Sequence, residues 1–492
     1  MVKKITCMGL VLIILLTFSS AGSAGLKAVS DFSGSGIQGY LDGKSSEAKF
    51  NQPYGIVMYT DGGLIVVDSF NNMIRKVKDG VVTDMAGNCS TKDSNGDPAV
   101  GFADGDAAKA RFSHPRDASK DSKGNIYVTD TGNHLIRKIS NGRVTTFSGT
   151  LKQGYQDGKA NEAKFNMPSG IAIDKFDNIY VADTLNHIIR KISPKGDVTT
   201  FAGKHSLTGG YQDGFSSQAL FNEPSDVKID KNGVLYVLDC GNQLVRRIEN
   251  GQVSTVAGLI DKINPDTGYV DGKYTDGQRA KAGFNFPKGL DIAEDGTIFI
   301  ADTWNNSIRV IKTEGNVATI AGTGIPGKRD DPLPQTQFNS PVDVLYHAGS
   351  LYISDRFNNG IRVMKFELND LPDITDKSAI VIGIRFKPKS EEIQVWLDKQ
   401  MVDFPDVKPY QADGKTYVTL RYVFEKWGAK VNYLKSGQVE VIKGRFYKVF
   451  TFGKDPIIFK NGRTMIDTAS LSEISGFYIE KIDQYNAIVI SP

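Results

Sequence analysis

The stretch DTGNHLIRKI (residues 130–139) decides the fold, because the chain contains six versions of it. The other five are DSFNNMIRKV (68–77), DTLNHIIRKI (183–192), DCGNQLVRRI (239–248), DTWNNSIRVI (302–311) and DRFNNGIRVM (355–364). Every copy has an Asp, an Asn three positions later and an Arg seven positions later, and successive Asp residues are 62, 53, 56, 63 and 53 residues apart. Such self-similarity indicates a repeat fold in which each copy is one structural unit.

Each unit contains four short segments with the pattern of β-strands. In the third unit they are IAID (171–174), which lies shortly after a Pro, then NIYVAD (178–183), HIIRKI (187–192) and VTTFAG (198–203). Apolar and polar residues alternate within such segments and turn signals separate them, which favours antiparallel strands over helices. Four strands in a unit of this size are typical of a β-propeller blade.

The sixth unit ends near Met364 without a fourth strand segment of its own. A segment of the missing type, VSDFSG (29–34), lies before the first unit. We therefore expect an N-terminal strand to complete the last blade and leave the ring without a free edge. The predicted fold is an all-β six-bladed propeller closed by an N-terminal strand, plus a small C-terminal α+β domain.

The repeat resembles the NHL repeat, whose name matches Asn133-His134-Leu135, and the resemblance extends over residues 26–366. It implies a six-bladed propeller that is usually a binding scaffold and occasionally an enzyme. The repeated Asp, Asn and Arg obey the symmetry of the ring, whereas a catalytic site breaks it, so we interpret them as structural. We expect the six arginines to join blades through carboxylates: Arg75, Arg137, Arg190, Arg246, Arg309 and Arg362.

A different domain is expected at residues 380–492, after a linker at 367–379. It is similar to the copper amine oxidase N-terminal-like domain, on the segments DKQ (398–400), DGKTYVTLRYVFEKWGAKVNY (413–433) and FGKDPIIFKNG (452–462). One helix is expected over residues 420–427. The region contains no His and no Cys, so it offers no copper ligands of those types. We expect a stalk or a surface-attachment module.

The first residues have the pattern of a secretory signal. Lys3 and Lys4 precede the apolar run GLVLIILLTF (9–18), and small residues follow it. We expect a signal peptide at 1–24 and a secreted or cell-surface protein of bacterial type. Ten apolar residues are fewer than the roughly 20 that a membrane helix needs, so no transmembrane segment is expected after cleavage.

Charge and cysteine content limit the partners. The formal net charge is +3, or +1 without Lys3 and Lys4, whereas a nucleic-acid-binding domain is clearly basic. No nucleic-acid partner is therefore expected. Cys89 and Cys240 lie in different repeats; they are either unpaired or, in an oxidising compartment, joined in a disulfide.

The second residue after each repeat Pro alternates between Gly and Asp around the ring, which brings Asp117, Asp226 and Asp343 near the channel mouth. Three carboxylates close together bind a cation or raise one another's pKa. No other cofactor is expected, but a divalent cation such as Ca²⁺ is a candidate here. The alternative is that each Asp bonds the backbone of its own loop.

Residues that break the symmetry are the candidates for ligand binding. Phe70, Trp304 and Phe357 stand at equivalent turn tips, and Tyr54 and Arg116 directly follow repeat Pro residues. Aromatic side chains exposed at turns stack on sugars or anchor peptides. The alternative for each aromatic is packing beneath the long loops.

These observations predict an exported, non-catalytic binding or scaffold protein whose propeller face binds a wall polysaccharide or a peptide or protein partner. The alternative is a metal-dependent lyase or hydrolase acting in the central channel. Against it, the sequence has no Ser-His-Asp or nucleophile-elbow motif. Its five histidines are expected in exposed loops rather than in a metal site: His114, His134, His187, His205 and His347.

Overall fold

The computed structural model describes residues 28–371, apart from 95, 97, 266, 314 and 331–335, and many shorter segments between 394 and 491. The expected signal peptide and residues 372–379 of the expected linker lie outside the described residues. No helix in the described part of the chain is long and apolar enough to cross a membrane.

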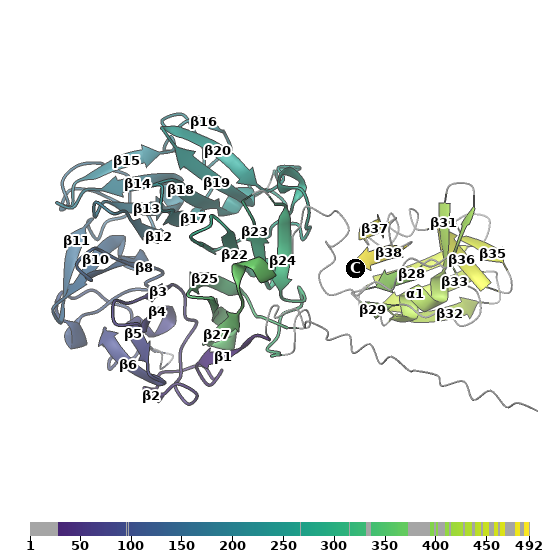
Figure 1. Cartoon of the computed structure of the whole chain (residues 1–492), viewed down its shortest axis with the longest axis horizontal. Coiled ribbons are helices and arrows are strands. Elements are labelled where there is room, and N and C mark those ends of the chain that lie inside the picture. The colour runs from purple at the N-terminus through teal and green to yellow at the C-terminus, as the bar shows by residue number, and fades with distance from the viewer. Residues whose placement is uncertain are drawn as a thin grey trace, which may run out of the picture.

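Residues 30–365 form six antiparallel sheets arranged around a central axis (Figure 1). Blade 1 comprises β2 (Gly43–Lys44), β3 (Ile56–Met58), β4 (Leu64–Asp68), β5 (Met73–Lys78) and β6 (Val81–Ala86). Blade 2 comprises β7 (Gly105–Asp106), β8 (Ala118–Lys120), β9 (Ile126–Asp130), β10 (Leu135–Ser140) and β11 (Arg143–Ser148). Blade 3 comprises β12 (Pro168–Ile173), β13 (Ile179–Asp183), β14 (Ile188–Ile192) and β15 (Val198–Ala202).

The other three blades have the same order of strands. Blade 4 comprises β16 (Gly214–Phe215), β17 (Pro224–Ile229), β18 (Leu235–Asp239), β19 (Leu244–Glu249) and β20 (Gln252–Ala257). Blade 5 comprises β21 (Gly289–Ile292), β22 (Ile298–Asp302), β23 (Ser307–Ile311) and β24 (Val317–Ala321). Blade 6 comprises β25 (Pro341–His347), β26 (Ser350–Asp355), β27 (Gly360–Lys365) and β1 (Ser30–Ser33), which pairs antiparallel with β27.

The innermost strands contact one another in a continuous ring, in the order β3, β8, β12, β17, β21, β25 and back to β3. The core lies between the blades, where apolar residues of neighbouring sheets pack together. One cluster joins Ile65 and Ile74 of blade 1 to Ile126 and Val128 of blade 2, all fully buried. The propeller therefore has six core layers, each shared by two blades, rather than one centre.

A one-turn 3-10 helix joins the second and third strands of each blade. These helices are η1 (Ser69–Asn71), η3 (Thr131–Asn133), η4 (Thr184–Asn186), η5 (Cys240–Asn242), η7 (Thr303–Asn305) and η8 (Arg356–Asn358). Each ends at an Asn, His or Gln in the left-handed conformation, such as His187 with φ 57°. Asn and His adopt this conformation more readily than most residues, so the repeat sequence suits the turn. The connections also contain η2 (Ala107–Lys109), η6 (Arg279–Lys281) and η9 (Leu368–Asp370).

The described C-terminal segments form three small sheets and one helix. Their strands are β28 (Gln394–Leu397), β29 (Gln400–Met401), β30 (Tyr410–Ala412), β31 (Lys415–Thr419), β32 (Lys430–Leu434), β33 (Gln438–Lys443), β34 (Phe446–Thr451), β35 (Ile457–Lys460), β36 (Arg463–Asp467), β37 (Tyr478–Ile482) and β38 (Ala487–Ser491). The helix α1 (Leu420–Lys426) begins where the sequence predicts it and contacts β31, β32 and β36. Leu420, Val423 and Phe424 are fully buried on it.

Candidate functional site

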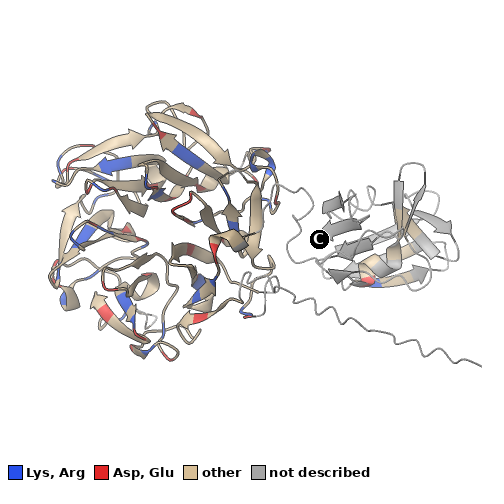
Figure 2. Ribbon diagram, in the orientation of Figure 1, with Lys and Arg blue, Asp and Glu red and all other residues tan. Residues whose placement is uncertain are grey.

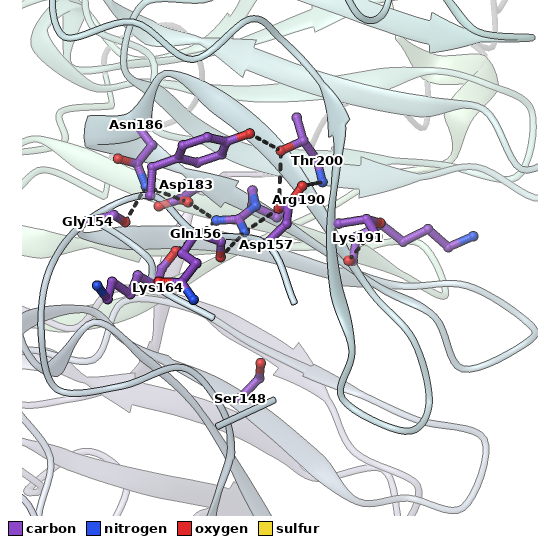
Figure 3. Close-up of polar contacts among 12 residues, drawn as sticks. Ser148, Gly154, Gln156, Asp157, Lys164, Asp183, Asn186, Arg190, Lys191 and Thr200 are labelled. Carbon is purple, nitrogen blue, oxygen red and sulfur yellow. Dashed lines mark hydrogen bonds and ion pairs between the residues drawn. The ribbon is translucent and has the colours of Figure 1, made fainter. Parts of the chain in front are cut away.

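The repeated Asp, Asn and Arg form a buried network within each blade. In blade 3, Arg190 Nη1 donates to Asp183 Oδ2 at 2.8 Å and Nη2 donates to Asp157 Oδ1 at 2.6 Å (Figure 3). Asn186 Nδ2 also donates to Asp183 Oδ2, at 2.8 Å. All six repeat arginines are completely buried, and basic residues recur on the third strand of each blade (Figure 2). This network holds the blade together.

The repeat arginines were expected to join neighbouring blades, but in the structure they join parts of one blade. Asp157 lies on the loop that enters blade 3, and the adjacent Gly158 pairs with Val198 of β15 in the same blade. Arg190 therefore ties a blade to its own entering loop rather than to a neighbouring blade.

One set of hydrogen bonds between neighbouring blades comes instead from the residue that follows the repeated Asn. His187 Nδ1 accepts a hydrogen bond from Glu223 N at 3.0 Å, and His134 Nδ1 accepts one from Met167 N at 3.1 Å. Equivalent bonds are accepted by Asn72, Gln243, Asn306 and Asn359. In each case the donor belongs to the next blade of the ring and has a positive φ.

These contacts correct the expectation of exposed loop histidines. His187 is buried, His134 is half-buried, and burial lowers the pKa of both imidazoles. His114 is also half-buried, and its ring lies 5.1 Å from that of Phe70. His347 is exposed, as expected.

Three layers of side chains line the channel, and the middle layer is the predicted alternation of Gly and Asp. Each Asp approaches the preceding Gly so closely that a side chain does not fit there: a Cβ on Gly170 would lie 2.4 Å from the Cα of Asp226. The same holds for Gly55 beside Asp117 and Gly289 beside Asp343. The alternation is therefore a steric requirement of the channel wall.

Each of the three carboxylates bonds two backbone N–H groups. Asp117 Oδ1 accepts from Ala118 N at 2.8 Å in its own loop, and its Oδ2 accepts from Ile171 N at 3.0 Å in the next blade. Asp226 bonds Val227 N and Leu290 N in the same way, at 2.7 and 2.9 Å. Asp343 bonds Val344 N and Ile56 N, at 2.9 and 2.8 Å. The hydrogen bond from each Asp to the backbone of its own loop is the alternative considered from the sequence. The second hydrogen bond, which joins each Asp to the next blade, was not considered from the sequence.

The cation among these carboxylates is a lysine. Lys228 Nζ lies 3.1 Å from Asp226 Oδ1 and 3.4 Å from Asp117 Oδ2. Lys228 belongs to the third layer, which lies deeper in the channel than the Asp ring. It is four positions after its repeat Pro, and Asp291 holds the same position in the neighbouring blade 5. Among the described residues, no group of three His, Cys, Asp or Glu side chains could hold a metal ion. The carboxylates predicted as a Ca²⁺ site thus have a different partner in this structure.

Burial and like charge control the titration of this layer. Burial raises the pKa of Asp226 to about 7, Lys228 opposes that rise, and the neighbouring Asp117 adds to it. The pKa of Asp343 is likewise raised by burial. Burial lowers the pKa of the Lys228 ammonium, but the surrounding carboxylates outweigh it and hold that pKa well above its ordinary value.

The outermost layer, directly after the Pro residues, is cationic. Tyr54, Arg116 and Lys288 line a cavity of about 20 Å³ above the Asp ring, which has room for about one water molecule. Arg356 joins them from η8, and its guanidinium carbon lies 5.6 Å from the centre of the Tyr54 ring. We call Tyr54, Arg116, Lys288 and Arg356 the channel mouth.

The predicted aromatic residues lie beside the channel mouth in two groups. Arg356 lies 4.5 Å from the ring of Phe357 and 5.7 Å from the ring of Phe70. On the other side, the ring of Phe286 lies 4.2 Å from that of Trp304 and 5.7 Å from Lys288 Nζ. Trp304 is 59% exposed and Phe357 is 45% exposed, whereas Phe70 is half-buried.

Of the residues predicted from the sequence, Tyr54 and Arg116 thus lie together above the Asp ring, while Trp304 belongs to a separate aromatic group. The predicted site residues did not include Lys228, Lys288, Asp291 or Arg356. Aligning the repeats on Pro would have revealed Lys228 and Asp291, because Val57, Ser119, Ala172 and Leu345 stand at their position in the other blades. Cys89 and Cys240, for which two alternatives were open, are both unpaired.

Family models match both parts of the chain. The NHL repeat matches residues 112–139, 221–248 and 284–311, and the copper amine oxidase N-terminal domain matches residues 396–490. NHL repeat-containing protein 2 of Bos taurus is 26% identical over 280 residues, which cover 49% of this chain and 36% of that protein. Teneurin-4 of Mus musculus is 27% identical over 376 residues, which cover 68% of this chain and 13% of that protein. The chain therefore spans about a third or less of these two relatives.

A similar fold has been solved in an auxiliary nutrient binding protein from Bacteroides thetaiotaomicron. The TM-score is 0.51 at 14% sequence identity, over 69% of this chain and 76% of that chain. At this identity the similarity concerns the fold. The chain carries NHL repeats in a six-bladed β-propeller and, after it, a copper amine oxidase N-terminal domain.

Proposed function

We propose that the propeller is a non-catalytic binding module, and that it presents the channel mouth and the neighbouring turn tips to a cell-wall polysaccharide. The observation that supports this proposal most is the exposure of Trp304 and Phe357 beside the mouth, at 59% and 45%. Exposed aromatic rings stack on the apolar faces of sugars.

The repeat network has no part in this function. Its side chains are buried and paired within each blade, whereas the residues around the mouth differ from blade to blade. The Bacteroides protein of similar fold is an auxiliary nutrient binding protein, which agrees with a binding role for this propeller.

We further propose that the protein is exported and stands at the cell surface, with the C-terminal domain as a stalk or attachment module. The basic residues and apolar run at positions 3–18 support export. This placement would bring the propeller into contact with wall polymers.

The test is binding of the full chain to purified wall polysaccharide, compared with the Trp304→Ala/Phe357→Ala double variant. Affinity should fall at least about tenfold, because two exposed aromatic contacts are lost. Phe176→Ala is the matched control, since Phe176 is 69% exposed in the turn between β12 and β13, at the opposite end of the strands from Pro168.

Equal affinity of the double variant and the unchanged protein would contradict the placement of the site. Binding of a wall peptide in place of the polysaccharide, with the same sensitivity to the double substitution, would retain the site and replace the ligand class.

A further inference from the structure

The cations of the channel mouth differ from the repeat arginines in having no carboxylate partner among the described residues. Each repeat arginine forms ion pairs with two or three Asp side chains, for example Arg137 with Asp130 and Asp104, both at 2.6 Å. Among the described residues, no ion pair includes Arg116, Lys288 or Arg356. Arg356 donates to the neutral oxygen Oε1 of Gln52, at 2.7 and 3.1 Å.

These cations nevertheless lie close together, on three different blades. The guanidinium carbons of Arg116 and Arg356 lie 5.5 and 5.6 Å from the centre of the Tyr54 ring. Lys288 lines the same cavity from blade 5. Half-buried positive charges that lie together without a counter-ion form a site for an anion.

The pKa of Tyr54 reflects the charged groups around its phenol. Burial raises the pKa of its phenol, but Arg116, Lys288 and Arg356 outweigh burial and bring the pKa below its ordinary value. This direction agrees with the short distances from Arg116 and Arg356 to the Tyr54 ring.

The Asp ring does not supply the missing partners. Both oxygens of Asp117 accept backbone hydrogen bonds, as do those of Asp226 and Asp343, and their nearest cation is Lys228. The mouth cations therefore have only neutral partners, such as Gln52 for Arg356 and Cys240 for Lys288.

An aromatic surface begins next to these cations. Lys288 Nζ lies 5.7 Å from the ring of Phe286, and that ring lies 4.2 Å from Trp304, which is largely exposed. A ligand with an anionic group and an adjoining ring would occupy both features at once.

We infer that the channel mouth is the subsite for the acidic group of a saccharide: Arg116, Lys288 and Arg356 bind its carboxylate or phosphate while the sugar ring stacks on Trp304. This inference rests on the proposed binding function and specifies its substrate class as an anionic glycan. A guanidinium pair suits either oxyanion, because both accept two parallel hydrogen bonds.

The experiment is calorimetric titration of the full chain at low ionic strength with trigalacturonate, with its methyl ester and with glucose 6-phosphate. The ester has the same rings without the charge. We expect the acid or the phosphate to bind at least about tenfold more tightly than the ester, and added salt to reduce this preference. Which of the two anions binds more tightly identifies the group.

Arg116→Gln and Lys288→Gln should each weaken binding of the preferred anion about tenfold, while Arg116→Lys should restore part of the loss. Arg143→Gln is the matched control, because Arg143 is 64% exposed on β11, outside the mouth. The melting temperature of each variant shows whether it is folded.

Equal affinity for the acid and its ester, or full affinity in folded Arg116→Gln/Lys288→Gln, would overturn the inference. If Trp304→Ala/Phe357→Ala still abolished binding in that case, the proposed function would stand without the anion subsite. If neither pair of substitutions changed binding, both proposals would fail.

Discussion

The propeller uses arginine in two contrasting ways. Arg190 in the blade is fully buried between Asp183 and Asp157, and five other blades repeat the arrangement. Arg116 at the channel mouth is half-buried, occurs in one blade and has no carboxylate partner among the described residues. The difference teaches that, in a fold with internal symmetry, the residues that obey the symmetry build the scaffold and those that break it are available for a ligand.

The largest expected effect comes from breaking the repeat network. Arg190→Ala should destabilise the protein by about 3–5 kcal/mol, because it leaves Asp183 buried without its partner. Arg116→Ala should cost less than about 1 kcal/mol. Denaturant unfolding of the two variants measures both values. A similar loss for each would mean that the mouth is also structural.

Replacing the channel lysine should have the next largest effect. Lys228→Met removes the cation beside Asp117 and Asp226 and should cost about 1.5–3 kcal/mol, the worth of hydrogen bonds to a charged group. Denaturant unfolding of the variant and of the unchanged protein measures this difference. Equal stability would show that the Asp ring does not need the lysine.

The Gly and Asp alternation should be sensitive to a single methyl group. Gly170→Ala places a Cβ 2.4 Å from the Cα of Asp226 and should destabilise the protein by about 1–3 kcal/mol through overpacking. Gly315→Ala is the comparison, because the nearest atom there is the Cβ of Lys312 at 3.1 Å. Equal melting temperatures of the two variants would show that the channel wall yields.

The smallest expected effect concerns the histidines between blades. Burial lowers the pKa of His134 and His187 below 6.5, so the unfolded chain binds protons more readily and stability is lost as the pH falls below 6.5. His134→Asn/His187→Asn keeps an acceptor of the kind found in three other blades. It should reduce this loss by an amount on the order of 1 kcal/mol or less. Melting curves at pH 7.5 and pH 5 for both proteins provide the comparison.

The sequence was sufficient to predict the scaffold because scaffold residues are repeated. Six copies of one pattern define the strands and the number of blades, and the alternation after Pro predicts where Asp117, Asp226 and Asp343 meet. The helix predicted at residues 420–427, directly before Gly428, is assigned to Leu420–Lys426 in the structure.

The contacts of the mouth could not be predicted in the same way. Arg356 contacts Tyr54 from a turn tip about 300 residues away in sequence. The direction of the Arg356 side chain depends on its conformation, which the sequence pattern does not give. The roles of His134 and His187 were missed because an imidazole in a turn looks exposed until the next blade is placed against it. Lys228 was missed because the expected ligands of a metal are carboxylates and imidazoles, and an ammonium group is neither.

The wall of the channel also constrains the size of the ring. Asp and Gly must alternate from one blade to the next, and an alternation of two partners can close only on an even number of members. Removing or adding one blade would bring two Asp residues together, or two Gly residues with a gap between them. The unit that can be exchanged, duplicated or deleted without disturbing the channel is therefore a pair of blades. The propeller consists of three such pairs in one chain.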